Sequence, residues 1–420
     1  MGTFHKAFSE EMAKVPRLLL LTLVKEKLST EGFAKHRGLA EALTNHCING
    51  GGDKFEWDDG VLSNYAPQKL EISFSKKDAA RLTELADTFM EQLPEIVEDI
   101  SKSAAEKLLK TLKRTWPEQA AYQMAVFNGF SGRLEARWGK GFDLLRMLLT
   151  ICHDLVLESV KRLRTSKTQK NRVLRDLMVR LHARACQITA EIITLMENGF
   201  ADGAMARWRT LYEVGVVTAV IAEAGEELAK SYIQHEVIES KFAMDEYARC
   251  HVALGYKPFP KRERQRTERA FAAAVRAHGG DFGKPYGWAA VHLKKKKVTF
   301  RDLEHAAQRS AMRSYYKMAS YSVHADTPKS IFYRLGVIGD QSIVIAGATD
   351  AGFTEPAQNT AFTLVQITGL LLADRMSNLD AMIKLRVLTM IRDEVPNTFF
   401  RAARKLKRDH TKFSAVKSRD

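Results

Sequence analysis

Apolar side chains recur at steps of three and four residues along most of the chain, the pattern of amphipathic helices. Between residues 76 and 116 the recurring positions are Leu82, Leu85, Phe89, Leu93, Ile96, Ile100, Leu108 and Leu112. Ser75 is the predicted N-cap of this helix, with Asp78 three residues later. Pro94 predicts a kink or a division within it.

The same periodicity predicts further helices, separated by segments rich in glycine and proline. These helices span residues 8–29, 32–46, 142–164, 170–198, 201–254, 261–277, 299–325, 355–390 and 396–408. The segment 332–347 differs, because β-branched residues lie on both sides of Gly339 and Asp340, a two-residue hairpin signal.

The predicted fold is therefore mainly α: a multi-helix bundle with one small β-hairpin near residues 332–347. Its length of 420 residues suggests two or three packing units. We expect an N-terminal helical region (1–75), an amphipathic helical region (76–165), a core helical bundle with the hairpin (171–395) and a basic C-terminal tail (396–420).

The longest early apolar run, residues 18–24, is too short to span a bilayer and lacks the outline of a signal peptide. The four cysteines have no C-x-x-C spacing, which argues against a disulfide framework and a structural zinc site. These features predict a cytoplasmic protein with reduced thiols and no membrane partner.

The net charge of +15 is concentrated in three segments. Residues 161–184 carry nine Lys/Arg against one acid, 257–301 thirteen against three, and 401–420 eight against two. Such clusters predict a polyanion partner, nucleic acid first, with RNA favoured over DNA. The predicted contacts are Lys161, Arg162, Arg164, Arg262, Arg264, Arg266, Lys294, Lys295, Lys296, Lys297, Arg404 and Lys405. The alternative is a set of solvated helix faces that bind nothing specific.

Common signatures of cofactor binding and hydrolysis are absent: G-x-x-x-x-G-K, G-x-G-x-x-G, H-E-x-x-H and G-x-S-x-G. We therefore predict no cofactor. Helical pairs at metal-ligand spacing occur at His235 and Glu239 and at Asp302 and His305, but solvated pairs of this kind are far commoner. No metal site is predicted.

Two stretches, "RDLMVRLH" (175–182) and "RKLKRDH" (404–410), fit the R-x(4 to 6)-H signature of HEPN ribonucleases. In that signature a histidine and an arginine converge on the scissile phosphate of RNA. A chain with twelve histidines and many arginines is expected to match it by chance. The motif alone therefore does not identify a nuclease.

Residues 203–225 form a nearly uniformly apolar helix that belongs inside a bundle, yet it carries Arg207, Arg209 and Glu213. Arg209 and Glu213 lie one turn apart, so they form either a core salt bridge or part of a polar pocket. His324 lies in the last turn of the predicted helix 299–325, and Asp326 and Pro328 stop that helix. A histidine there either caps the helix or faces the pocket.

The stretches "ARWRTLYEVGVV", "SYSVHAD" and "RLGVIGDQSIVIAG" resemble a bacterial family catalogued only as a domain of unknown function, number 5677. The resemblance covers about residues 145–388. It implies a helical bundle whose shared polar positions match Arg209, Glu213 and His324, and it brings no established activity.

Two functions remain open from the sequence. The first is a nucleic-acid-directed effector that cleaves or modifies RNA, with catalytic His324 as general acid/base, Arg209 as phosphate clamp and Glu213 as the orienting group. The second is a non-catalytic adaptor whose basic patches bind nucleic acid or an acidic protein. Whether the chain is an enzyme stays open, and a homo-oligomer is compatible with either function.

Overall fold

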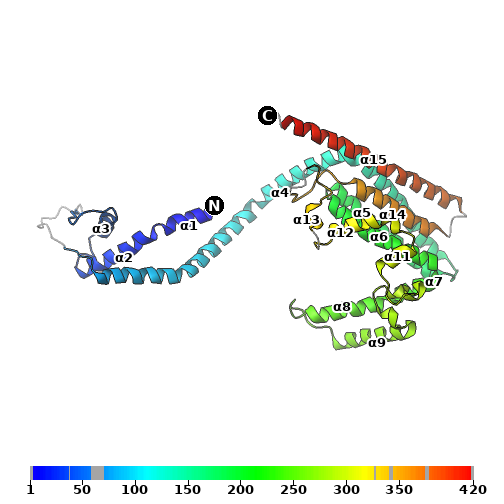
Figure 1. The fold of residues 1–420 in the computed structure, drawn as a ribbon, viewed down its shortest axis with the longest axis horizontal. Helices are drawn as coiled ribbons and strands as arrows, with labels where there is room; N and C mark the ends of the chain where they lie inside the picture. Colours follow the sequence, from blue (N-terminus) through cyan, green and yellow to red (C-terminus); the bar gives the residue numbers. More distant parts are fainter. Residues whose placement is uncertain are drawn as a thin grey trace. The chain divides into compact units, whose positions relative to one another are not determined.

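The computed structural model describes residues 3–36, 38–57, 71–325, 328–339, 344–373 and 378–417. Helices make up almost all regular structure in these ranges (Figure 1), and none of these residues lies in a strand. The mainly α, multi-helix prediction is confirmed. Among the described helices, none is both long and apolar enough to cross a membrane. The chain divides into two compact units, Met1–Tyr122 and Gln123–Asp420.

The first unit contains α1 (Thr3–Met12), α2 (Val15–Thr30), α3 (Leu39–Ile48) and the beginning of α4 (Lys76–Thr165). A small core forms around Val24, Leu28 and Leu39, where α2 packs on α3. The predicted start of α4 is confirmed, because the Ser75 backbone N–H and hydroxyl both donate to the Asp78 carboxylate, at 2.6 and 2.8 Å. The Ser75 N–H, then Lys27 and the Ser75 hydroxyl, lower the pKa of Asp78 to about 2.

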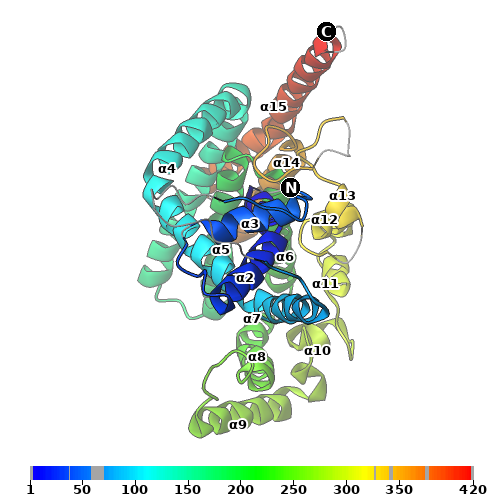
Figure 2. The same cartoon turned by 90° about the vertical axis from the view of Figure 1, so that its left-hand side faces the viewer.

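The second unit begins within α4 and contains the remaining helices. They are α5 (Arg172–Glu197), α6 (Ala201–Ala224), α7 (Glu226–Gln234), α8 (Glu236–Cys250), α9 (Lys261–His278), η1 (Gly280–Gly283), η2 (Gly287–Ala289), α10 (Ala290–Leu293), α11 (Phe300–Ala306), η3 (Ser310–Met312), α12 (Arg313–Tyr321), α13 (Lys329–Phe332), α14 (Thr354–Leu372) and α15 (Leu379–Lys417). Helices α8 and α9 lie side by side at one end of this unit (Figures 1 and 2).

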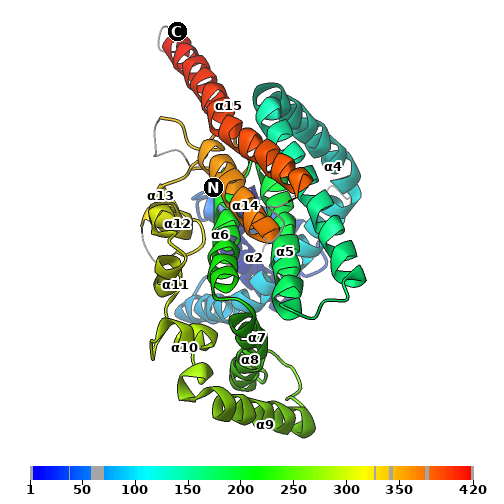
Figure 3. The same ribbon diagram turned by 90° about the vertical axis from the view of Figure 1, so that its right-hand side faces the viewer.

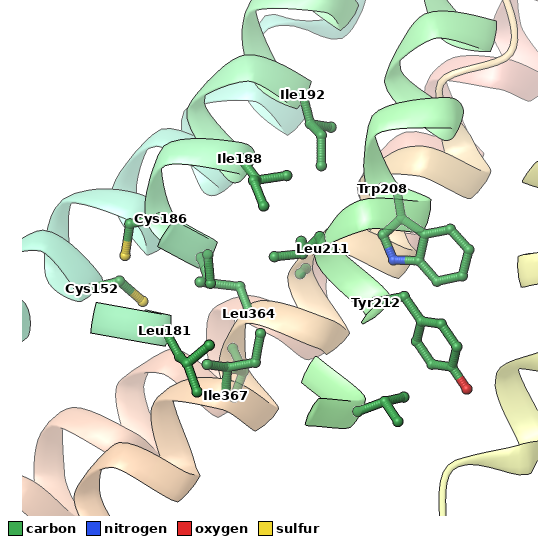
Figure 4. Packing of buried hydrophobic residues seen from close by; sticks show 14 of the residues in the cluster. Cys152, Leu181, Cys186, Ile188, Ile192, Trp208, Leu211, Tyr212, Leu364 and Ile367 are labelled. Carbon is green, nitrogen blue, oxygen red and sulfur yellow. The ribbon is translucent and has the colours of Figure 1, made fainter. Parts of the chain in front are cut away.

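Helices α5, α6 and α14 pack against one another at the centre of this unit, and α15 packs on α14 (Figure 3). The apolar character of α6 predicted this central place: Trp208 and Leu211 are fully buried (Figure 4). Gly215 lets α14 approach closely, since a Cβ there would lie 3.2 Å from a Thr363 methyl carbon. The Trp208 indole N–H donates to the Thr363 hydroxyl at 3.1 Å, so the polar edge of this buried ring is satisfied.

Several predicted helix limits need correction. The predicted helix 201–254 is three helices, because Gly225 adopts a left-handed φ of 84° after α6 and the chain turns again at His235. The predicted helix 299–325 is α11, η3 and α12, with Gln308 at a positive φ of 54° between them. Pro94 and Pro396 do not end their helices: α4 and α15 continue through them.

The predicted β-hairpin is not supported. Residues 332–339 and 344–347 form no strand. Residues 340–343, including the turn residue Asp340, lie outside the described residues. Val344 is 90% exposed, so one predicted strand lacks the apolar packing that a two-stranded hairpin needs to be stable.

Candidate functional site

Arg209 and Glu213 on α6 meet in an ion pair, with 3.1 Å between Nη2 and Oε1. Tyr316 from α12 joins them: its hydroxyl donates to Glu213 Oε1 at 2.7 Å and accepts from Arg209 Nη2 at 2.6 Å. The Arg209 guanidinium also lies 4.6 Å from the centre of the Tyr316 ring. Burial, and then the bond to Glu213, raise the pKa of Tyr316, so its hydroxyl keeps its proton.

A second group of charged residues adjoins this pair. Glu304 on α11 is 1% exposed and forms an ion pair with Arg313 of α12. The Tyr212 hydroxyl lies 3.0 Å from Glu304 Oε1 and 2.8 Å from the carbonyl oxygen of Arg309. Arg313 also lies 5.4 Å from the centre of the Tyr316 ring, so that ring contacts two guanidinium groups. The term paired cluster here covers Arg209, Tyr212, Glu213, Glu304, Arg313 and Tyr316.

The paired cluster joins α6, α11 and α12. Sequence periodicity indicated only the i, i+4 pair on α6, because Glu304, Arg313 and Tyr316 come from helices about 90 to 110 residues away. The Arg209 and Glu213 side chains are 23% and 32% exposed, so this pair is partly buried. Both carboxylates accept hydrogen bonds and both guanidinium groups have anionic partners. These contacts join α6, α11 and α12.

His324 lies beyond the end of α12, which stops at Tyr321, and its side chain is exposed. Its backbone N–H donates to the Ser320 carbonyl at 3.0 Å. In the described part of the chain, no hydrogen bond or ion pair joins its imidazole to Arg209 or Glu213. Asp326, expected to help stop this helix, lies outside the described residues. The structure thus joins two members of the predicted catalytic set and not the third.

In the first R-x(4 to 6)-H match, Arg175 and His182 have different surroundings. His182 is fully buried, and its Nε2 lies 2.9 Å from the Thr368 hydroxyl. Burial lowers the pKa of His182 to about 4, so the ring is neutral at physiological pH. Arg175 instead donates to three backbone carbonyls, those of Thr168, Lys170 and Asn171. Arg175 and His182 therefore do not converge on an exposed site.

The second match, Arg404 and His410, lies on α15, and both side chains are exposed. Arg404 stacks over the Phe400 ring at 5.7 Å. His410 is six residues after Arg404, a rotation of about 600° around the helix, so the two side chains lie on different faces. The spacing alone therefore does not make this a nuclease site.

The two residue pairs at metal-ligand spacing contact other groups of the protein. His235 lies 3.5 Å from Glu239 and also 3.1 Å from the Lys284 carbonyl oxygen, with its ring packed on Phe282. Asp302 caps α11 by accepting from Thr299, and it pairs with Lys295 at 2.5 Å. No cluster of three or more His, Cys, Asp or Glu suited to a metal ion occurs within the described ranges.

The predicted nucleic-acid contacts are all exposed, but they lie at four different places. They occupy the end of α4, the start of α9, the segment after α10, and α15. Within the described residues, two of them have carboxylate partners: Arg264 with Glu268 at 3.1 Å and Lys295 with Asp302 at 2.5 Å. The remaining ten make no ion pair with a described residue, so their charges are available to an external anion.

The densest of these places is the connection between α4 and α5. Residues 161–175, named the basic turn here, contain seven Lys/Arg and no Asp or Glu. In the described structure none of the seven pairs with a carboxylate, and six are exposed. The seventh, Arg175, fixes the shape of the turn through its three carbonyl bonds. Glu226 accepts from the N–H groups of Val173 and Leu174 and thereby caps α5.

A cleft of about 580 Å³ opens beside the basic turn. Its rim is polar and cationic, with Arg162, Ser166, Thr168, Lys170 and Asn171. Its floor is apolar, with Leu163, Leu174, Met178, Leu370 and Leu371. This cleft is called the turn cleft below. Its cations were predicted from the sequence. Its apolar floor could not be predicted, because α14 brings Leu370 and Leu371 beside α5 from about 200 residues away.

A second cleft of about 510 Å³ lies between α7, α9 and the segment around Trp288. Its polar lining is mixed: Glu227 pairs with Lys230 at 2.7 Å, and His278 and His292 are also present. It therefore lacks the uniform positive charge of the turn cleft.

Fold and site together define an all-helical bundle protein with a basic, apolar-floored surface cleft. Residues 175–342 match the model of the Family of unknown function (DUF5677), so this segment is similar to that family. The match confirms the resemblance found in the sequence over a shorter range than 145–388, and it includes Arg209, Glu213 and His324. Neither the search of curated proteins nor that of solved structures found a match.

Proposed function

We propose that this protein binds single-stranded nucleic acid at the turn cleft, with RNA preferred over DNA, and that it acts as a binding protein rather than a nuclease. The observation that carries the proposal is the unpaired positive charge of the basic turn. Six exposed Lys/Arg within residues 161–172 make no ion pair with a described carboxylate. Cations without an internal counterion are the usual contacts for a phosphate backbone.

The shape of the cleft favours a single strand over a duplex. An unpaired base can enter a cavity of about 580 Å³ and lie on Leu163, Leu174 and Met178 while its phosphates remain at the cationic rim. A base inside a duplex is stacked on both faces and cannot do so. Ser166, Thr168 and Asn171 at the rim offer hydroxyl and amide groups to a ribose 2′-hydroxyl, which is the basis for preferring RNA.

The candidate acid/base groups favour binding over cleavage. His182 is neutral and buried, Tyr316 keeps its proton, and His324 makes no described contact with Arg209 or Glu213. None of these groups lines the turn cleft. A general acid or base must lie within hydrogen-bonding reach of the reacting atoms.

The test is fluorescence anisotropy with the full chain and a short labelled RNA of mixed sequence, beside the same sequence as single-stranded DNA and as duplex. We expect the order RNA, single-stranded DNA, duplex, with a slope of log affinity against log salt of about −0.7 for each neutralised phosphate of a single strand. The double variant Arg162→Glu, Lys170→Glu should weaken RNA binding by about a hundredfold at low salt, since each reversal removes one contact and adds a repulsion.

The matched control is Arg262→Glu, Arg266→Glu on α9, which reverses two exposed and unpaired arginines away from the cleft. It should weaken binding much less. An equal loss in both double variants would move the site away from the cleft, and no binding by the wild type at low salt would end the proposal. RNA fragments that form with the wild type and disappear with His324→Asn would show that the protein is a nuclease.

A further inference from the structure

The connection between α8 and α9 exposes several large hydrophobic side chains close together. Residues 251–260, named the hairpin tip here, join these two helices, which lie at one end of the second unit (Figures 1 and 3). Four residues of the tip are large, hydrophobic and 41% to 78% exposed: Val252, Leu254, Tyr256 and Phe259. Apolar groups gathered in this way on a protein surface are typical of a binding site.

The hairpin tip has a fixed backbone. Gly255 adopts a left-handed φ of 70°, and the N–H groups of Gly255 and Tyr256 donate to carbonyls three and five residues earlier, at 3.1 and 2.8 Å. From α8, the Tyr247 hydroxyl donates to the Lys257 carbonyl at 2.7 Å, and the Tyr247 ring lies 4.6 Å from that of Phe259. The exposure of the apolar side chains is therefore a property of the fold.

Positive charge lies directly behind the tip. Residues 247–266 contain six Lys/Arg and one acid. Three exposed cations, named the collar here, make no ion pair with a described residue: Lys257, Lys261 and Arg262. Each lies within three positions of Tyr256 or Phe259 along the chain. The apolar groups at the tip are therefore followed at once by unpaired positive charge.

The positive charge continues along α9. Four exposed arginines lie within about 80° of one another around this helix: Arg262, Arg266, Arg269 and Arg276. In the described structure none of the four pairs with a carboxylate. Phe271 and Val275 pack against the core from the other side of the helix. The outer face of α9 is therefore basic from the collar to the last turn of the helix.

An anionic lipid surface matches these features better than a nucleic acid does. The aliphatic side chains of Val252 and Leu254 gain nothing from phosphates, and RNA sites instead stack bases on aromatic rings. A bilayer surface offers an apolar phase to such side chains and anionic headgroups to Lys and Arg. Aromatic side chains such as Tyr256 favour the level of the headgroups. An inserted tip is surrounded by lipid, so its apolar side chains need not share one helix face.

We propose that the hairpin tip inserts into the surface of an anionic lipid bilayer, with the collar and the outer face of α9 attracted to the headgroups. The predicted absence of a membrane partner was based on the lack of a spanning segment, and attachment to a surface needs none. The tip contributes no residue to the turn cleft. This proposal is independent of RNA binding there, so either can fail without the other.

Co-sedimentation with vesicles tests the attachment. The full chain is mixed with vesicles of phosphatidylcholine that contain about one third phosphatidylserine, and with vesicles of phosphatidylcholine alone. Binding to the anionic vesicles should be at least about tenfold tighter. It should weaken as salt is added, because salt screens the attraction between the collar and the headgroups. A wild type that does not bind the anionic vesicles at low salt would overturn the proposal.

Matched substitutions test the apolar side chains. Val252→Ser, Leu254→Ser alters two tip residues that are 78% and 59% exposed. The control Val291→Ser, Leu157→Ser alters the same residue types at 79% and 60% exposure elsewhere in the second unit. The tip variant should bind anionic vesicles at least about tenfold more weakly than the wild type, and the control should bind equally well. If all three proteins bind alike, the tip does not insert and the proposal is wrong.

Charge reversal distinguishes a lipid surface from a nucleic acid. Arg262→Glu, Arg266→Glu should remove most of the preference for anionic vesicles and keep most of the RNA affinity. Arg162→Glu, Lys170→Glu in the basic turn should have the opposite result. An α9 variant that loses RNA binding and keeps vesicle binding would make the hairpin a nucleic-acid site and contradict the lipid proposal.

Insertion is measured with a polarity-sensitive fluorophore at Val252→Cys, in a background where the half-exposed Cys47 and Cys250 are serine. Anionic vesicles should shift its emission to shorter wavelengths, because the label moves from water into the bilayer surface. The same label at Val291→Cys should keep its emission. A bound protein whose label at position 252 keeps its aqueous emission is attached by charge alone, and that result would refute insertion.

Discussion

The paired cluster and the basic turn are both rich in cations, but they differ in what surrounds each charge. In the paired cluster Arg209 and Arg313 each have a carboxylate partner and share the ring of Tyr316. In the basic turn no Lys or Arg has a described carboxylate partner. The difference teaches that residue type does not assign a role: an arginine with a buried counterion fixes helices, and one without a counterion is available to a ligand.

The largest expected loss in the free energy of unfolding is that of Arg313→Gln. This change leaves the Glu304 carboxylate, which is 1% exposed, without its cation. Removing one partner of a buried pair costs about 3 to 5 kcal/mol, and we expect a loss of about 3 because Arg313 itself is 44% exposed. Chemical denaturation measures this loss. RNA affinity of the folded variant should equal that of the wild type, and a fall in affinity would contradict the structural role of the cluster.

The next largest expected effect is on the pH dependence of stability, and it comes from His182 on α5, the helix that begins in the basic turn. Its pKa in the folded chain is about 4, below the value of about 6.5 in an unfolded chain. As pH falls, the unfolded chain therefore takes up this proton first, and stability is lost between about pH 6.5 and pH 4. The loss reaches about 3 kcal/mol, from 1.36 kcal/mol per pKa unit.

Denaturation at a series of pH values measures this contribution. His182→Gln should flatten the pH dependence over that window, even if it lowers stability at pH 7. His410→Gln, which alters an exposed histidine on α15, should leave the dependence as it is in the wild type. An unchanged slope in His182→Gln would contradict the buried, neutral histidine.

Glu213→Ala should have an intermediate effect. Arg209 loses its carboxylate but keeps the Tyr316 hydroxyl and ring, and both members of the pair are partly exposed. We expect a loss of about 1 to 2 kcal/mol, below the cost of breaking a fully buried pair. The melting temperature should fall by about 2 to 4 °C per kcal/mol in a chain of this size. No change in melting temperature would mean that the pair contributes nothing to stability.

The smallest effect on stability should come from Arg162→Gln in the basic turn. Arg162 is exposed and has no described carboxylate partner, so the unfolding free energy should change by no more than about 0.5 kcal/mol. The salt slope of RNA binding should instead become shallower by about 0.7. Arg313→Gln should lower stability and leave RNA binding unchanged, whereas Arg162→Gln should weaken the salt dependence of RNA binding and leave stability unchanged. If both change stability alike, the comparison between the two regions fails.

The sequence determined those features that depend on neighbouring residues. Periodicity predicted the helical class, the central place of α6 and the start of α4 at Ser75 and Asp78. It also located the i, i+4 pair and the cations of the basic turn, because charge density and helical spacing are properties of a continuous stretch. It did not find that Gly225 divides a long helix, since a glycine in a helical pattern ends a helix only where its φ becomes positive.

The tertiary structure decided every feature that joins distant parts of the second unit. Only packing brought Tyr316 to Arg209, Glu304 to Arg313, and Leu370 beneath the basic turn. Packing also buried His182 and left His324 exposed, although both are histidines in predicted helices. The physical reason is that burial and pairing are set by which helix faces meet, and a single helix pattern does not specify its neighbours.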